Sequence, residues 1–145
     1  MAALLAQICG IKKNKINTAL NKIKNVDGRL QLIRILPNKS KVYIDYAHTP
    51  DALYNSLKSL KDFYKNNISI VFGCGGERDI KKRPLMAKSA KFFCKKIYIT
   101  DDNPRNENPK KIRNAIIKNL AKESFIDIAD RTKAIETAIQ NAEPY

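Results

Sequence analysis

The sequence ISIVFGCGGERDIKKRPLM, residues 68–86, decides the fold, because it holds one complete strand, a loop and the start of a helix. Residues 68–72 form a short apolar run, which is typical of a buried strand, and Pro84 can open the helix that follows. A polar, glycine-rich cluster, residues 73–79, lies between them. A strand followed by a helix is the repeating unit of an α/β fold with a parallel sheet.

The same alternation continues on both sides of this stretch. Apolar patterns predict strands over 30–36, 42–44, 97–100 and 125–128, and helices over 49–64, 108–120 and 134–139. In the helix that Pro84 opens, we expect Leu85, Ser89, Phe92 and Phe93 to face inward. Repeated strand–helix units with right-handed crossovers indicate a Rossmann-like, mostly parallel sheet flanked by helices.

Residues 1–27 differ from the rest, because their apolar pattern predicts two short helices that turn at Gly10. Asp27 and Gly28 mark a turn, which places a boundary near Gly28. We expect residues 28–145 to form one α/β domain. Its pattern stops where a doubly wound sheet would enter another strand, so we expect this domain to be incomplete at its C-terminal end.

The chain is strongly basic, with 28 Lys and Arg against 14 Asp and Glu and a formal net charge of +14. The basic residues are spread along the chain, and no aromatic residues alternate with them as a stacking surface for nucleic acid requires. We therefore interpret the charge first as solvated surface, second as an attraction for acidic small molecules, and last as a nucleic-acid footprint.

Cys9, Cys74 and Cys94 form no C-x-x-C pair, and His48 is the only histidine, which argues against a zinc site. Unpaired cysteines favour a reducing, cytoplasmic setting. Neither Cys74 nor Cys94 has a general base nearby in sequence, so nucleophilic catalysis is not expected. The apolar residues 1–8 are too few for a membrane span and lack the features of a secretory signal.

Three polar clusters each follow a predicted strand and precede a predicted helix, namely residues 45–51, 73–79 and 101–105. Loops that leave the carboxyl ends of neighbouring parallel strands lie side by side, so the three clusters can line one crevice. We therefore predict a small-molecule site at this edge of the sheet.

The cluster at 73–79 matches neither G-x-x-x-x-G-K-[ST] nor G-x-G-x-x-G. Its glycines would still permit close backbone approach to a ligand, and Arg78 offers a planar fork for a carboxylate or a phosphate. A tight turn in which Arg78 pairs with Glu77 or Asp79 is an equal alternative.

The cluster at 101–105 combines opposite charges with a backbone stiffened by Pro104. Arg105 can take a carboxylate in bidentate fashion, while Asp102 and the Asn103 amide can accept ammonium hydrogens, so this loop could hold a zwitterion. An Asx-type turn with a local ion pair is the alternative.

In the cluster at 45–51, Asp45 occupies a position where carboxylates accept ribose hydroxyls or support a metal shell. His48 could stack on a ligand or hydrogen-bond to it. Helix capping by Asp45 and Thr49, and a structural or exposed His48, are the alternatives.

Taken in order, these motifs closely resemble the C-terminal region of the Mur ligase family, which builds the peptidoglycan stem peptide. The resemblance rests on Gly28-Arg29, on DYAHTPDAL at 45–53, on VFGCGGERD at 71–79 with KRPLM at 82–86, and on TDDNPR at 100–105. Order and spacing agree across nearly the whole chain. The D-N-P-R form resembles the branch of the family that adds meso-diaminopimelate.

The resemblance implies a cytoplasmic ATP-dependent amide-bond ligase that uses Mg²⁺ and adds meso-diaminopimelate to UDP-N-acetylmuramoyl-L-alanyl-D-glutamate. In that family ATP phosphorylates the glutamate carboxylate, and the amine of the incoming amino acid attacks the acyl phosphate. By position, Arg29, Asp45 and His48 are expected to contact ATP.

The same resemblance implies that the clusters at 73–79 and 101–105 bind the incoming diaminopimelate. The expected contacts are Arg78, Asp102, Asn103, Pro104 and Arg105. Arg105 can pair with the second carboxylate of diaminopimelate, which a lysine substrate lacks. No side chain of the chain is expected to be catalytic, because the domain acts by positioning its ligands.

The chain also departs from the family pattern. Glu77 stands where the family usually has Asp, and Ile80-Lys81 alters a stretch usually richer in Gly and Lys. No uridine-nucleotide domain, Walker loop or candidate carbamylated lysine is present, and the family's Gly-Lys-Gly-His-Glu segment is expected soon after Tyr145.

We therefore expect residues 1–27 to be the helical tail of the central ATPase domain, and the Mg²⁺ ligands to lie outside this chain. Alone, the chain is expected to be an inactive fragment that requires the missing N-terminal and central domains as partners. A stand-alone module that binds diaminopimelate or a nucleotide without catalysis is the alternative function.

Overall fold

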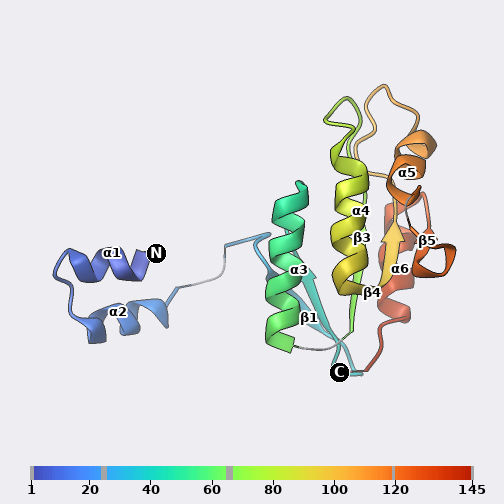
Figure 1. Ribbon diagram of the computed structural model, residues 1–145. Coiled ribbons are helices and arrows are strands. Elements are labelled where there is room, and N and C mark those ends of the chain that lie inside the picture. Colours follow the sequence, from blue (N-terminus) through green and yellow to red (C-terminus); the bar gives the residue numbers. More distant parts are fainter. Residues whose placement is uncertain (1, 24–25, 65–66, 119, 145) are drawn as a thin grey trace.

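The structure is a computed structural model that describes residues 2–23, 26–64, 67–118 and 120–144. Helices α1 (Ala2–Ile8) and α2 (Lys13–Leu20) pack against each other and lie apart from the α/β part of the molecule (Figure 1). The two helices agree with the two predicted from the apolar spacing, and the turn between them contains Gly10 with a positive φ of 83°.

In the described ranges, five strands form two separate sheets. Strands β1 (Gln31–Ile35) and β2 (Lys41–Ile44) form an antiparallel pair. Strands β3 (Ile68–Phe72), β4 (Cys94–Ile99) and β5 (Phe125–Asp127) form a parallel sheet in the order β3-β4-β5. The α/β class with a parallel sheet is therefore confirmed. Among the described residues, no strand pairing joins the antiparallel pair to the parallel sheet.

The helices of the α/β part lie between the strands in sequence, as the alternation predicts. They are α3 (Pro50–Tyr64), α4 (Lys82–Phe93), α5 (Pro109–Ile117) and α6 (Arg131–Gln140), with a short 3₁₀ turn at Lys122–Ser124. Helix α4 packs between α3 and α5, and α6 contacts β3 and β4 (Figure 1). None of the helices in the described ranges is long and apolar enough to cross a membrane.

The core lies between the parallel sheet and the helices α3, α4 and α5. Its buried members come from all of these elements: Leu53, Leu57, Phe72, Cys74, Met86, Ala87, Ala90, Ile97, Ile99, Ile112 and Ile116. Side chains alternate along a strand, so the fully buried Tyr98 faces away from Ile97 and Ile99, toward the side that α6 covers. The sheet is therefore covered on both faces, as parallel sheets require.

The predicted inward face of α4 is wrong. Leu85 is 50% exposed and Phe92 is 74% exposed, whereas the buried face consists of Arg83, Met86, Ala87 and Ala90. Helix α4 packs between two other helices, and small alanines let the backbones approach closely. Phe93 does pack partly against the core, and the Ser89 hydroxyl donates to the Pro50 carbonyl oxygen over 3.4 Å.

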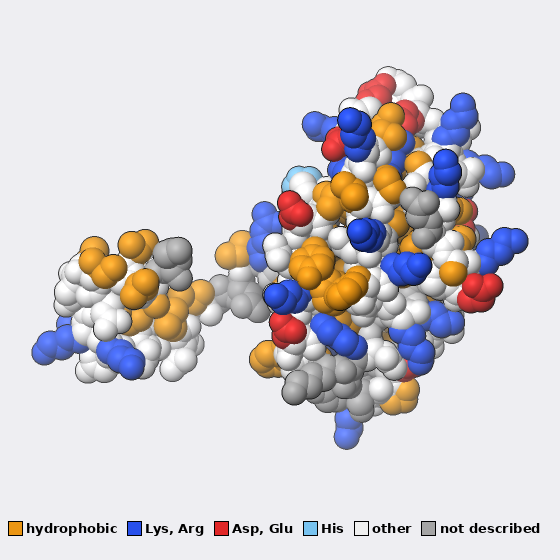
Figure 2. All heavy atoms as spheres, viewed as in Figure 1, with side chains coloured by type: hydrophobic (Ala, Val, Ile, Leu, Met, Phe, Trp, Pro, Cys, Tyr) orange, Lys and Arg blue, Asp and Glu red, His pale blue; other side chains and the backbone are white. Residues whose placement is uncertain are grey.

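Apolar side chains also gather on the surface. Figure 2 shows one group on α1 and α2 and another over α3 and α4. The first includes the exposed Leu4, Leu5 and Ile8, and the second is built from Tyr54, Phe92 and Phe93, whose rings pack against one another.

Candidate functional site

The predicted site lies where the parallel strands end. Phe72 of β3 pairs with Ile99 of β4, and Ile99 pairs with Asp127 of β5, so the three strands stop in register at one edge. The glycine loop (residues 73–81) leaves β3 there, and the DNPR loop (residues 100–108) leaves β4 beside it. Two of the three polar clusters are therefore brought together, as the sequence predicted.

The glycines let these two loops interlock. A Cβ atom on Gly73 would overlap the Thr100 carbonyl oxygen, and one on Gly76 would overlap the Pro104 carbonyl oxygen. The Gly76 N–H instead donates to the Asn103 carbonyl oxygen over 2.9 Å. Sequence reasoning considered approach to a ligand or a tight turn, whereas these glycines serve the approach of one loop to another.

Arg105 joins the two loops through its side chain. Its backbone adopts a positive φ of 50°, and its Nη1 donates to the Gly76 carbonyl oxygen over 2.5 Å. A guanidinium carries five N–H donors, so most of its capacity remains for a ligand. Arg105 and Arg78 are both exposed, and they stand on two loops that are fastened together.

The remaining residues of the DNPR loop form a local turn. Asp102 Oδ1 accepts a 2.7 Å hydrogen bond from the Asn103 N–H, which is the Asx-type contact considered as the alternative. Within the described ranges, neither Arg78 nor Arg105 forms an ion pair with a neighbouring carboxylate. The local ion pairs considered for these two arginines are thus wrong, and both guanidinium groups remain available.

An ion pair between a buried arginine and a partly exposed glutamate supports the interlocked loops, and sequence reasoning missed it. Arg83 Nη2 lies 2.9 Å from each carboxylate oxygen of Glu107. Glu107 Oε1 also accepts the Glu77 N–H over 2.5 Å. This N–H, followed by the Arg83 guanidinium, holds the pKa of the Glu107 carboxyl below its ordinary value. Arg83 lies at helical spacing from Met86, Ala87 and Ala90, which is the signal that could have revealed its burial.

A second charged cluster anchors the start of the DNPR loop. Arg113 of α5 donates through Nε to Asp127 over 2.6 Å and through Nη1 to Asp101. Burial acts to lower the pKa of Arg113, but the two carboxylates outweigh it and the pKa is raised. Asp101 is therefore engaged in structure, which separates it from the exposed Asp102.

The predicted nucleotide residues occupy the loop between β2 and α3. Asp45 Oδ2 accepts the Leu30 N–H over 2.8 Å, and Oδ1 accepts the Ala47 N–H over 2.8 Å and the Ser56 hydroxyl over 3.1 Å. A carboxylate has about four acceptor positions, so Asp45 is mostly used within the protein. Thr49 Oγ1 accepts the Ala52 N–H over 3.2 Å, which confirms its capping of α3.

Arg29 and His48 both lie against Tyr46. The Arg29 guanidinium carbon is 5.3 Å from the centre of the Tyr46 ring, and the His48 ring is 5.7 Å from it. The Lys82 ammonium donates to the His48 carbonyl oxygen over 3.0 Å. This contact ties the third polar cluster to the end of the glycine loop, where α4 begins.

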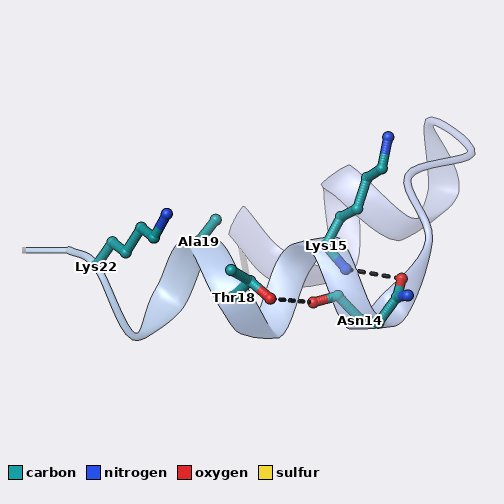
Figure 3. Close-up of a pocket in the computed structure, with 5 residues that line it drawn as sticks. All are labelled: Asn14, Lys15, Thr18, Ala19 and Lys22. Atoms are coloured by element: carbon teal, nitrogen blue, oxygen red, sulfur yellow. Dashed lines mark hydrogen bonds between the residues drawn. The ribbon is translucent and has the colours of Figure 1, made fainter.

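Open hollows lie on the surface of the described part of the chain. One, of about 270 Å³, is lined by Arg29, Leu30, Asp45, Asn55, Ser56 and Ser59, and thus adjoins two of the predicted nucleotide residues. Another, of about 330 Å³, lies on α2 beside Asn14, Lys15, Thr18, Ala19 and Lys22 (Figure 3). Asn14 accepts hydrogen bonds from the Lys15 N–H and the Thr18 hydroxyl, and no residue predicted for the site lies there.

Cys74 and Cys94 lie in surroundings that disfavour the thiolate form. Burial raises the pKa of Cys74 to about 11 and that of Cys94 to about 12. Reactive cysteines instead have lowered pKa values. Over the same ranges, no three side chains among His, Cys, Asp and Glu are grouped to hold a metal ion.

Comparison with known proteins gives a consistent result. The family described as Mur ligase, glutamate ligase domain, matches residues 28–145. UDP-N-acetylmuramoyl-L-alanyl-D-glutamate--2,6-diaminopimelate ligase of Rickettsia bellii is 45% identical over 130 residues, which cover 88% of this chain and 27% of the relative. The ligase of the same name from Chelativorans sp. is 41% identical over 139 residues, which cover 96% of this chain and 28% of the relative.

Solved structures agree. A structure titled UDP-N-acetylmuramoyl-L-alanyl-D-glutamate--2,6-diaminopimelate ligase superposes with a TM-score of 0.73 and 35% identity, covering 98% of this chain and 29% of its own. A Yersinia pestis folylpolyglutamate synthase/dihydrofolate synthase, solved with AMPPNP and a Mn ion, superposes with a TM-score of 0.68 at 18% identity, covering 92% of this chain and 30% of its own. The second likeness shows the fold alone. The chain thus spans less than a third of the length of these relatives.

Proposed function

The chain belongs to the Mur ligase family, and from this membership we propose that it forms the part of an ATP-dependent amide ligase that holds the incoming amino acid. The proposed amino acid is meso-diaminopimelate, and the proposed acceptor is UDP-N-acetylmuramoyl-L-alanyl-D-glutamate. The names of the relatives at 41–45% identity support both assignments.

The interlocked loops are the observation that carries this proposal. Arg78 and Arg105 stand exposed on two loops joined by the Gly76 hydrogen bonds. Diaminopimelate has two carboxylates and two ammonium groups. Guanidinium forks at a defined spacing suit the two carboxylates, while Asp102 and the Asn103 amide offer acceptors for ammonium hydrogens.

The proposed reaction is amide formation through an activated acid. The γ-phosphoryl group of ATP is transferred to the glutamate carboxylate, which gives an acyl phosphate and ADP. The amine of diaminopimelate then forms the new C–N bond, the C–O bond to phosphate breaks, and inorganic phosphate and a proton leave. This chain contributes positioning, because holding the amine near the acyl carbon replaces a collision in solution by a local step.

Contact with ATP is proposed for Arg29, Asp45 and His48. The hollow beside Arg29 and Asp45 supports this assignment, and so does the stacking of Arg29 on Tyr46. Asp45 retains about one free acceptor position, which limits it to a single further hydrogen bond. The Mg²⁺ ligands are proposed to lie outside this chain.

Two units are proposed along the chain. Residues 1–27 are assigned to the helical tail of a central ATPase domain, and residues 28–145 to the C-terminal ligase domain. The start of the family match at residue 28 and the separate position of α1 and α2 support this division (Figure 1).

A chimeric ligase tests the proposal. The matching segment of the Rickettsia bellii ligase is replaced by this chain, and amide formation is measured with meso-diaminopimelate and with L-lysine as the amino acid. The expected result is activity that prefers diaminopimelate. A well-folded chimera that shows no preference between the two amino acids would contradict the assigned substrate.

A further inference from the structure

The Arg83–Glu107 pair lies beside the proposed amino-acid site without belonging to it. The Arg83 side chain is 4% exposed and the Glu107 side chain 28% exposed. Arg83 Nε is buried and has no hydrogen-bond partner among the described residues. Because Glu107 is partly exposed, water screens the pair and its contribution to stability is modest. What distinguishes the pair is its position between two loops.

Glu107 contacts both loops at once. Its carboxylate accepts the Glu77 N–H of the glycine loop, and its own N–H donates to the Pro104 carbonyl oxygen of the DNPR loop over 3.0 Å. The Asn106 amide also donates to the Glu77 carboxylate over 2.8 Å. Glu77 is thereby held with a positive φ of 51°, which a non-glycine residue adopts only with such support.

Glu77 directly precedes Arg78, and Pro104 directly precedes Arg105. Glu107 therefore contacts the backbone of the residue directly before each of the two arginines that are proposed to bind carboxylates. Arg83 fixes Glu107 from α4 and reaches the Gly75 carbonyl oxygen over 3.4 Å, so the rigid helix sets the position of the pair.

We propose that Arg83 and Glu107 are positioning residues that set the spacing of Arg78 and Arg105 and thereby select an amino acid with two carboxylates. The inference rests on the proposed function, because it concerns the same ligand. Neither residue touches the ligand. Their effect acts through the backbone of Glu77 and Pro104.

The Glu107→Gln variant tests this inference in the 145-residue chain. The substitution removes the negative charge and replaces one acceptor oxygen by an amide donor, so Arg83 keeps only one of its two contacts and the hydrogen bond from the Glu77 N–H is weakened. The matched control is Glu143→Gln, which removes the same charge from another carboxylate that pairs with a basic residue, Lys95, and leaves both loops untouched. Binding of meso-diaminopimelate and of L-lysine is measured by NMR titration, with amide hydrogen exchange and melting temperature recorded for each variant.

We expect Glu107→Gln to weaken diaminopimelate binding about tenfold more than Glu143→Gln does, with a smaller effect on lysine. Exchange at Gly76 and Glu77 should accelerate in Glu107→Gln alone. Arg83→Lys keeps the positive charge and loses the planar guanidinium group, so it should also weaken diaminopimelate binding. This variant replaces Glu107→Gln in the test if Glu107→Gln does not fold. Equal losses for the two amino acids, or the same loss in the control, would overturn the inference.

The exchange rates separate this inference from the proposed function. If the parent chain binds no diaminopimelate, the proposed function fails. Amide hydrogen exchange at Gly76 and Glu77 then decides by itself whether the Arg83–Glu107 pair stabilises the two loops. Unchanged exchange rates at these two amides in Glu107→Gln would refute the proposed positioning role of the pair.

Discussion

The Gly76 N–H donates to the Asn103 carbonyl oxygen over 2.9 Å, and this contact fastens the glycine loop to the DNPR loop. Each loop follows a different strand of the parallel sheet, so the hydrogen bond joins segments 27 residues apart in the sequence. Parallel strands bring such loops together, and the absence of a side chain at residue 76 lets them touch.

Gly76→Ala is expected to destabilise the fold by about 1–3 kcal/mol or more, because the new Cβ would overlap the Pro104 carbonyl oxygen. Gly75→Ala is the matched control. Its nearest neighbour is Arg105 Nη1, 3.1 Å away at the end of a flexible side chain, so a smaller loss is expected. Urea unfolding followed by circular dichroism measures both. Equal stability of the two variants would contradict the interlocking of the loops.

Arg105→Ala in the chimeric ligase is expected to raise KM for diaminopimelate at least about tenfold, since a charged hydrogen bond contributes about 1.5–3 kcal/mol. KM for ATP should change little. Arg131→Ala removes the same charge from an exposed position at the start of α6 and should leave both constants unchanged. A rise in KM for ATP as large as that for diaminopimelate would place Arg105 outside the amino-acid site.

The acid stability of the parent and of Glu107→Gln should differ in a defined pH range. The pKa of Glu107 is below its ordinary value of 4.5 in the folded state, so its stabilisation is complete above about pH 4.5 and is lost as pH falls through the lower folded value. The difference in free energy of unfolding should stay constant between about pH 7 and 5 and narrow at lower pH. If the difference in free energy of unfolding grew as the pH was lowered, the pKa of Glu107 would be raised by folding and not lowered.

Asp45→Ala is expected to cost about 1–3 kcal/mol of stability, because the Leu30 and Ala47 N–H groups would lose their acceptor. Asp51→Ala is the control, since Asp51 is exposed in the first turn of α3 and contributes less than about 1 kcal/mol there. Thermal unfolding distinguishes them. An Asp45→Ala variant as stable as the control would leave nucleotide contact as the main role of Asp45.

The sequence predicted the elements better than the faces they bury. The run at 68–72 became β3 as expected, because a short apolar segment between polar loops has few other ways to hide its side chains. The buried face of α4 was predicted wrongly, because Leu85 and Phe92 are the more apolar residues while close helix packing selected Ala87 and Ala90. Packing depends on neighbours that local periodicity does not contain.

The meeting of the two loops was predictable, and the contacts that support them were not. Strand ends and polar clusters predicted that the loops of Arg78 and Arg105 lie side by side, since this follows from the order of strands and helices. The Arg83–Glu107 pair joins residues 24 apart, and its burial depends on how two loops cross. The antiparallel pairing of β1 with β2 follows from the short connection over residues 36–40, which cannot hold the crossover that parallel strands need.

Titration of the ¹⁵N-labelled chain with meso-diaminopimelate, and separately with L-lysine, tests the central claim most directly. We predict saturable shifts at the amides of Gly76, Asn103 and Arg105, with tighter binding of diaminopimelate than of lysine because only diaminopimelate has a second carboxylate. Absence of saturable shifts at these amides, or equal affinity for the two amino acids, would contradict the account.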